Sequence, residues 1–146
     1  MKITAHFSLS ELTITATGLQ NIPEAKHMVN LTKLAHTLEQ VRVACGNRAV
    51  IISSAFRSLA VNKKVGGSDT SAHLRGDAAD LTVSGLTIAE VCKIIRESGI
   101  EFDQLIEEYH NGSEWVHLGL SSNPRNEYLI FKNGAYKRGE DYASYF

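Results

Sequence analysis

The chain has 146 residues, of which 43% are hydrophobic and 21% charged, as expected for one globular domain with a single core. Its 15 basic and 16 acidic residues give a formal net charge of −1, so no overall positive field favours a nucleic acid or an anionic membrane as the partner. No apolar run is long enough to cross a bilayer, and the first residues lack the basic-then-apolar pattern of a secretory signal.

The first half of the chain predicts a capped turn, two helical segments and a strand. Serine and glutamate at capping spacing place a single helical turn at residues 8–12. From residue 23 to residue 45 apolar side chains recur with a helical period, between a proline suited to a first turn and a glycine suited to a stop. Residues 49–56 are rich in β-branched side chains and predict a strand, and residues 58–67 predict a short helix closed by paired glycines.

The second half predicts a further helix and several strands. Residues 78–83 read as a strand, and residues 87–99 as an amphipathic helix that ends at a glycine. Residues 103–109 and 114–120 predict two strands joined by a turn-rich connection, and from residue 127 a strand, an Asn-Gly turn and a short partner strand follow. Helix, strand, strand, helix and then a meander predict an α+β domain with a small, mainly antiparallel sheet flanked by helices.

Two of the predicted strands each carry a polar side chain on the face that turns away from the core. Alternation places Asp80 on the non-core face of the first strand, beside Ala78. It places His117 on the non-core face of the later strand, beside Gly119. The small neighbours leave space next to both polar groups, as a binding site requires.

His73, seven residues before Asp80, completes a set of two imidazoles and one carboxylate with His117. Zinc takes this ligand mix in catalytic sites and leaves its fourth position for water. Any chain with six histidines offers such triples, so the spacing also allows the two histidines to be unrelated polar residues.

The two cysteines predict neither a metal site nor a nucleophile. Cys45 and Cys92 lie far apart, in apolar and helix-like contexts, and neither belongs to a CxxC pair. This excludes a cysteine zinc site on ligand count. A cysteine-dependent amidase is disfavoured because neither cysteine lies in a motif with histidine and asparagine or aspartate.

Three separated blocks of the sequence are SAFRS (54–58), VGGSDTSAHLRGDAADL (65–81) and EWVHLGL (114–120). They closely resemble, in order, the signature blocks of the M15 zinc peptidases, which include D-alanyl-D-alanine carboxypeptidases and murein endopeptidases. The resemblance begins at FSLSEL (7–12) and so covers most of the chain. It implies a small antiparallel sheet flanked by helices, as in hedgehog-type domains, in agreement with the α+β prediction. It also implies one zinc ion and the peptide stems of bacterial peptidoglycan as substrate.

The resemblance further implies roles for individual residues. His73, Asp80 and His117 correspond to the zinc ligands of the family. Arg57 corresponds to the arginine that steadies the scissile carbonyl and its oxyanion. Ser71 corresponds to a serine that contacts the substrate, although a turn or capping hydroxyl explains a serine at this position equally well.

The family's general base lies three residues before the last histidine, and Glu114 occupies that place. In a regular strand, residues three apart face opposite sides and lie roughly 10 Å apart. Glu114 therefore reaches the site only if the strand begins at Trp115 or bends there, and the preceding turn-rich segment favours such a bend. Glu107 and Glu108 are the alternatives. By alternation from Gln104, Glu108 shares that residue's face and Glu107 does not.

The leading hypothesis is a monomeric zinc peptidase over a single domain, residues 1–146, that hydrolyses peptidoglycan stem peptides as a D,D-carboxypeptidase or a murein endopeptidase. Chain length and the lack of a signal resemble phage or prophage lytic proteins (endolysins), made in the cytoplasm and released to the cell wall by lysis or by a phage particle. The alternative is a zinc-containing binding or structural module of the same fold that does not cleave. The bond that is cut and the role of the aromatic C-terminal residues 136–146 stay open.

Overall fold

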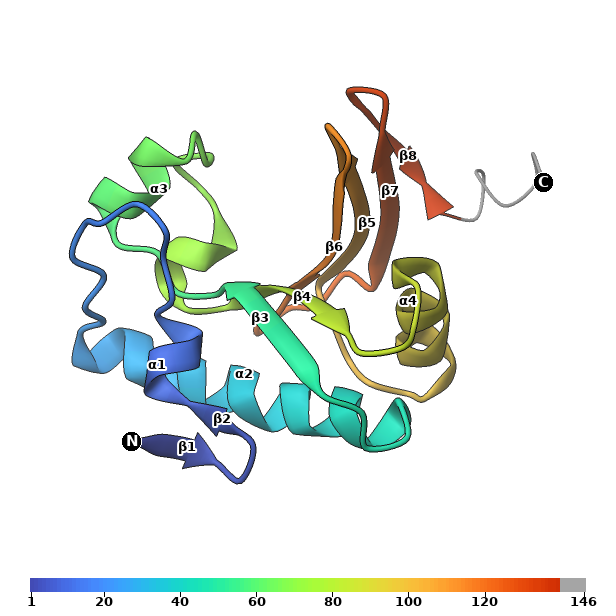
Figure 1. Cartoon of the computed structure of the whole chain (residues 1–146), viewed down its shortest axis with the longest axis horizontal. Coiled ribbons are helices and arrows are strands. Elements are labelled where there is room, and N and C mark those ends of the chain that lie inside the picture. Colours follow the sequence, from blue (N-terminus) through green and yellow to red (C-terminus); the bar gives the residue numbers. More distant parts are fainter. Residues whose placement is uncertain (140–146) are drawn as a thin grey trace.

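A computed structural model describes residues 1–139 of the chain, so the aromatic C-terminal segment lies mostly outside the described residues (Figure 1). The helices and strands of the described part are, in chain order, β1 (Lys2–Thr4), β2 (Phe7–Ser8), α1 (Leu9–Leu12), α2 (Ala25–Ala44), β3 (Val50–Ser54), α3 (Leu59–Lys64), the 3₁₀ turn η1 (Ala72–Arg75), β4 (Ala78–Val83), α4 (Ile88–Glu97), β5 (Gln104–His110), β6 (Ser113–Gly119), β7 (Glu127–Lys132) and β8 (Ala135–Arg138).

The main sheet has six strands in the order β3-β4-β6-β5-β7-β8, and β1 pairs with β2 in a separate small sheet. All neighbours in the main sheet are antiparallel except β5 and β7, which are parallel. The predicted α+β class with a mainly antiparallel sheet is confirmed. The predicted meander is wrong, because β4 occupies the second edge of β6 and β7 pairs with β5 instead.

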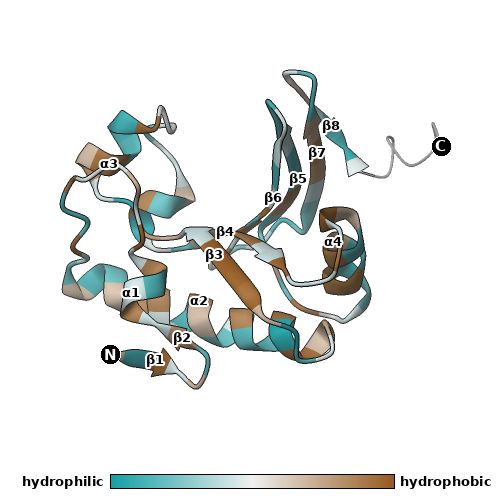
Figure 2. Cartoon of the chain, in the orientation of Figure 1, coloured by the Kyte–Doolittle hydropathy of each residue, from teal (hydrophilic) through white to brown (hydrophobic). Residues whose placement is uncertain are grey.

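The core lies between the helices and one face of the sheet. The long helix α2 runs below β3, and α4 packs against β4, β5 and β6, while β5 to β8 rise as a curved wing (Figure 1). Apolar residues one helical turn apart on α2 are fully buried, and the strand β3 is strongly hydrophobic in Figure 2. Burying each such leucine or isoleucine contributes about 1.5–3 kcal/mol. The opposite face of β4, β6 and β5 is left for polar side chains.

The predicted helix boundaries follow from their caps. Ser8 caps α1 and Thr87 caps α4, each in a reciprocal capping box with a glutamate three residues later. After α2 the chain turns at Gly46, whose φ of 77° lies in the left-handed region that glycine tolerates. None of the helices within residues 1–139 combines the length and the apolar character that crossing a membrane requires.

Both cysteines are buried and free. Burial raises the pKa of the Cys45 thiol, and it raises the pKa of Cys92 well above the ordinary range, where the charge of Glu107 adds to the effect. The neutral thiol is a poor nucleophile, so the prediction of two small buried hydrophobes agrees with their surroundings.

Two-residue turns close both hairpins of the wing. Asn111 and Gly112 join β5 to β6, and Asn133 and Gly134 join β7 to β8, all four with positive φ. Positive φ at both central positions defines the type I′ turn, whose twist matches that of the paired strands. The β5–β6 ladder therefore runs in regular register up to the pair His110–Ser113.

Candidate metal centre

His73 is presented to the sheet by the 3₁₀ turn η1. The hydroxyl of Ser71 accepts a hydrogen bond from the backbone N–H of His73 at 3.2 Å and so caps this turn. Gly76 ends it with a φ of 81°, and a Cβ at that position would lie 3.1 Å from Leu31 of α2. Only glycine satisfies both the left-handed backbone and the close approach. The Ser-x-His-x-x-Gly spacing thus folds into a tight turn that buries the imidazole, which is 3% exposed.

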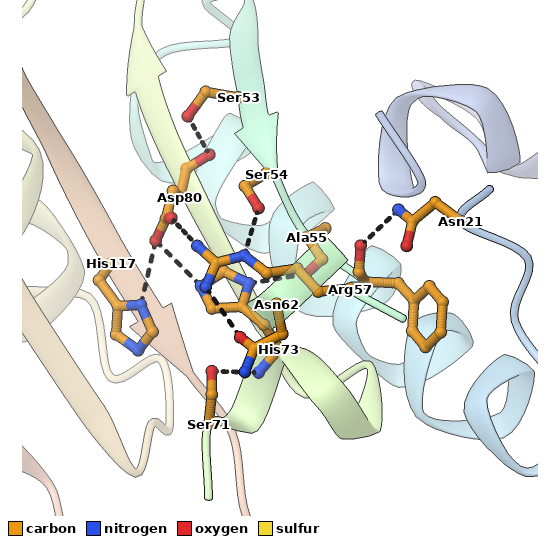
Figure 3. Close-up of polar contacts among 11 residues, drawn as sticks. Asn21, Ser53, Ser54, Ala55, Arg57, Asn62, Ser71, His73, Asp80 and His117 are labelled. Carbon is orange, nitrogen blue, oxygen red and sulfur yellow. Dashed lines mark hydrogen bonds and ion pairs between the residues drawn. The ribbon is translucent and has the colours of Figure 1, made fainter. Parts of the chain in front are cut away.

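Asp80 and His117 lie directly opposite each other in the β4–β6 ladder. Directly paired residues share a face, so both side chains point to the side that the core does not occupy. The Oδ1 atom of Asp80 lies 3.0 Å from Nδ1 of His117 and 3.3 Å from Nε2 of His73 (Figure 3). The three potential ligand atoms all lie within 4.8 Å of one another. The structure therefore brings together the three residues that the sequence predicts as ligands.

These separations fit a zinc ion. Zinc binds imidazole nitrogen and carboxylate oxygen at roughly 2.0–2.2 Å, so neighbouring ligand atoms of a tetrahedral site stand roughly 3.3 Å apart. Nδ1 of His73 lies 2.6 Å from the carbonyl oxygen of Ala55. A proton on that Nδ1 donates to the carbonyl and leaves Nε2 free to face Asp80, which is how an outer partner orients a metal-binding histidine.

The electrostatic surroundings keep Asp80 ionised. Burial alone raises the pKa of this carboxyl, but the charge and hydrogen bonds of His73 and His117 outweigh it and hold the pKa well below its usual range. A carboxylate that stays charged at all working pH values is suited to bind a cation.

Arg57 braces the second oxygen of Asp80. Its Nη2 lies 3.3 Å from Oδ2 of Asp80, and its Nε donates to the hydroxyl of Ser54 at 3.0 Å (Figure 3). The guanidinium is mostly buried at the floor of the site. The predicted contact with a scissile carbonyl stays a prediction, and the contact with Asp80 adds a role that sequence analysis missed.

The three predicted ligands lie at the floor of a cleft of about 520 Å³. One wall is built from backbone and small polar side chains of residues 66–72, including Ser71. The other wall comes from the wing and carries larger side chains: Ile106, Glu108, Trp115 and Tyr136. Ser71 both caps η1 and lines the cleft, so its two predicted roles are compatible.

Residues 5–119 match the peptidase M15 family. The chain belongs to that family. It is also 32% identical over 62 residues to the zinc D-Ala-D-Ala carboxypeptidase of Streptomyces albus G, a match that covers 42% of this chain and 24% of that enzyme. The chain thus spans about a quarter of the length of that relative.

The predicted base of this M15 family member does not lie in the cleft. Glu114 is exposed and sits within the regular part of β6, paired with Tyr109. It lines a separate depression near the β5–β6 turn, on the face opposite to His117. β6 neither begins at Trp115 nor bends there, because the type I′ turn keeps the strand regular from Ser113 onward.

Glu108 lies in the cleft, on the face of the sheet that carries Asp80 and His117. It pairs with Trp115, two residues from His117 on the same face, and it lines the cleft. Burial raises the pKa of the Glu108 carboxyl, and the negative charge of Asp80 raises it further, against smaller opposing effects of His117 and Arg57. Since Asp80, His117 and Arg57 all contribute to this pKa shift, Glu108 lies near the charged groups of the site.

Glu107 belongs to the core side of the same strand. It is 5% exposed and accepts hydrogen bonds from the hydroxyls of Tyr109, at 2.9 Å, and Tyr128. Of the three glutamates considered from sequence, only Glu108 shares the cleft with the candidate ligands. The separation of Glu108 from Glu107 by alternation from Gln104 is confirmed.

Two parts of the cleft are not predicted by the sequence. Tyr136 of β8 and Arg125, from the segment between β6 and β7, both line it. Arg125 is held by Asp103 through its backbone N–H and its guanidinium, at 2.9–3.0 Å. Neither position carries a signal in a single sequence, since both depend on the order of strands across the sheet.

Proposed function

We propose that this protein is a zinc peptidase that hydrolyses amide bonds in the peptide stems of bacterial peptidoglycan. The observation that carries the proposal is the cluster of His73, Asp80 and His117 at tetrahedral spacing on the floor of a cleft. Membership of the M15 family and the similarity to a zinc D-Ala-D-Ala carboxypeptidase support the same chemistry.

His73, Asp80 and His117 would hold one zinc ion, with Nε2 of His73, Oδ1 of Asp80 and Nδ1 of His117 as the ligand atoms. Bound there, zinc would supply Lewis acidity and make water a nucleophile near neutral pH. Ionised Asp80 supplies negative charge to that site, and the carbonyl of Ala55 fixes the orientation of His73.

We assign the general base to Glu108 and not to Glu114. Its carboxylate accepts a proton from the attacking water and returns it to the leaving amine, which requires a group on the cleft side of the sheet. Its raised pKa brings it nearer to the working pH, where a base also serves as an acid. Arg57 places a fixed positive charge beside the floor, where negative charge develops on the tetrahedral intermediate.

The shape of the cleft favours cleavage of an internal bond. Ile106 lies opposite His117, and the cleft extends along β5 to Gln104 on one side and Glu108 on the other. At roughly 3.3 Å per residue, this gives roughly 7 Å of cleft on each side of the candidate metal centre. A peptide can therefore continue in both directions from the scissile bond, as an endopeptidase requires.

A second candidate is a zinc-containing binding module that does not cleave. The exposed position of Glu114, outside the cleft, favours it, because the expected base is absent from the site. Glu108 opposes it, because a carboxyl with a raised pKa is present in the cleft.

Mass spectrometry of purified stem peptides and muropeptides distinguishes these functions. We expect cleavage that a chelator abolishes and added zinc restores, with a product whose new ends lie inside the stem. Release of a single terminal D-alanine would instead assign a carboxypeptidase. A wild-type protein that binds zinc and leaves every stem intact would establish the binding module.

We further propose that the protein acts as a monomer at the bacterial cell wall, after release by lysis or by a phage particle. The small net charge supports a peptide and not a nucleic acid as its partner. Size-exclusion chromatography tests the monomer, and loss of turbidity of permeabilised cells on addition of the protein tests the site of action.

A further inference from the structure

Asn62 is a buried polar side chain between the cleft wall and the floor. It lies on α3, is 3% exposed, and has no role in the proposed chemistry. Its Oδ1 accepts a hydrogen bond from Nη1 of Arg57 at 3.3 Å, and its Nδ2 donates to the carbonyl of Ser68 at 3.0 Å. Its own backbone carbonyl accepts from the N–H of Gly67 at 2.9 Å. One residue thus contacts both the wall and the floor, and Figure 3 shows its contact with Arg57 at the floor.

The wall is packed so tightly against Asn62 that position 67 has no room for a side chain. A Cβ on Gly67 would lie 2.1 Å from Oδ1 of Asn62 and 3.1 Å from Nη1 of Arg57. The preceding Gly66 differs, since it has a φ of 76° and a Cβ there would meet nothing within 4 Å. Gly66 is therefore needed for the turn, whereas Gly67 is needed for the contact with Asn62.

The guanidinium of Arg57 is fixed on three sides. Its Nε donates to Ser54, its Nη1 to Asn62 and its Nη2 to Oδ2 of Asp80. Because the guanidinium is planar, removing one of these partners leaves the group free to tilt away from the other two. Asn62 is the partner that connects Arg57 to the wall of the cleft.

We propose that Asn62 is a positioning residue that couples the Gly67–Ser68 wall to the Arg57–Asp80 pair. Its Oδ1 holds Arg57 at the angle that braces Asp80 and faces the cleft. Its Nδ2 holds the wall against which substrate lies. The kinetic test of this inference rests on the proposed peptidase function. The zinc-affinity test rests only on the candidate metal centre and needs no substrate.

A double-substitution cycle tests the coupling. Asn62→Ala, Arg57→Ala and the double variant are compared for kcat and KM on a stem peptide, and for zinc affinity by competition with a chromogenic chelator. We expect Asn62→Ala to lower kcat by ~10-fold and to weaken zinc binding measurably, because Arg57, the outer partner of Asp80, then loses a contact that fixes it. We expect little further loss of either quantity in the Arg57→Ala background. Equal losses in both backgrounds would overturn the proposal, since Asn62 would then act independently of Arg57.

Asn62→Asp separates the two halves of the side chain and covers the case in which the alanine variant does not fold. It keeps the oxygen that faces Arg57 and loses the N–H that donates to Ser68. We expect kcat to stay within about threefold of wild type while KM rises. A purely structural asparagine predicts that Asn62→Asp lowers the melting temperature and leaves the ratio of kcat to KM unchanged.

Gly67→Ala provides a steric test, with Gly66→Ala as its matched neighbour. Gly67→Ala must displace Asn62, so we expect it to reproduce the kcat loss of Asn62→Ala. It should add little in a variant that already carries Asn62→Ala, where only the 3.1 Å approach to Arg57 remains. Gly66→Ala strains only the backbone and should lower stability with a smaller effect on kcat.

A wild-type protein without peptidase activity would refute the proposed function, and zinc competition would still test Asn62. Unchanged kcat and zinc affinity in Asn62→Ala would refute this inference alone.

Discussion

Glu107 and Glu108 are consecutive residues of β5 with opposite surroundings. Glu108 faces the cleft with Trp115 and the candidate metal ligands. Glu107 faces the core, where the hydroxyls of Tyr109 and Tyr128 both donate to its carboxylate. The face of the strand, and not distance along the chain from a ligand, therefore decides which acid can serve the chemistry.

The two faces of β5 also differ in which ionisable groups have a raised pKa. On the core face, burial raises the pKa of Tyr109 and Tyr128, and the hydrogen bonds and charge of Glu107 raise it further. Both tyrosines therefore remain neutral donors at any working pH. On the cleft face, burial and Asp80 raise the pKa of Glu108, which makes it a better proton acceptor. On the core face the two tyrosine hydroxyls keep their protons, whereas on the cleft face the carboxyl of Glu108 can gain and lose a proton.

The largest expected effect comes from removing the ligand set of the cleft face. Asp80→Asn removes the charge that His73, His117 and Arg57 surround, so we expect loss of bound zinc and of all cleavage above background. Metal content by atomic emission and cleavage by mass spectrometry measure the two losses. Asp77→Asn is the matched control, because Asp77 pairs with the exposed Arg75 outside the ligand set. Stoichiometric zinc in Asp80→Asn would disprove the proposed ligand set.

The next largest effect separates the two candidate bases. Glu108→Gln should lower kcat by ~10²–10⁴-fold and retain zinc, because it removes the proton acceptor and not a ligand. Glu114→Gln should stay within about twofold of wild type, because Glu114 is exposed on the other face. The two variants are compared in one kinetic assay with metal content measured in parallel. The reverse pattern would return the base to Glu114 and require the β5–β6 hairpin to rearrange.

A third substitution perturbs the core face alone. Glu107→Gln has only one acceptor oxygen for the buried hydroxyl of Tyr128 and the half-buried hydroxyl of Tyr109, so we expect the free energy of unfolding to fall by about 1–3 kcal/mol. Urea denaturation measures this loss, and kcat should stay near that of wild type. A Tyr128→Phe background should reduce the loss, since one hydroxyl then no longer needs a partner. A large drop in kcat at unchanged stability would show that the two faces are not independent.

The sequence predicted which face of each strand is buried, and which segments form strands, better than it predicted which strands lie side by side. Residues 78–83 form β4 as expected, and alternation correctly placed Asp80 and His117 on one side of the sheet. Strand order was not predictable, because a hydrophobic pattern states which face is buried and not which strand lies next to it. This is why the pairing of β5 with β7 was missed, and with it the position of Tyr136 in the cleft.

The two candidate bases make different demands on the β5–β6 hairpin. The three-residue spacing between Glu114 and His117 matches a family motif and requires a bend in β6, which the structure lacks. The turn at Asn111 and Gly112 is of the type that keeps a hairpin regular, and that signal was present in the sequence. Turn chemistry and alternation agree on Glu108, whereas the motif spacing alone favours Glu114.

The smallest expected effect concerns the pH dependence that Glu108 gives to the cleft face. A base must be ionised to act, so kcat/KM should fall as pH drops through its pKa, which lies above the ordinary glutamate value of 4.5. Trp115→Ala exposes Glu108 to water and removes part of the cause of that shift, since burial is its largest component. We expect the acid limb of the kcat/KM profile to move to lower pH by less than about one unit. Glu114→Gln, on the opposite face, should leave the limb in place. An acid limb that moves with Glu114→Gln and not with Trp115→Ala would show that the proton acceptor lies outside the cleft.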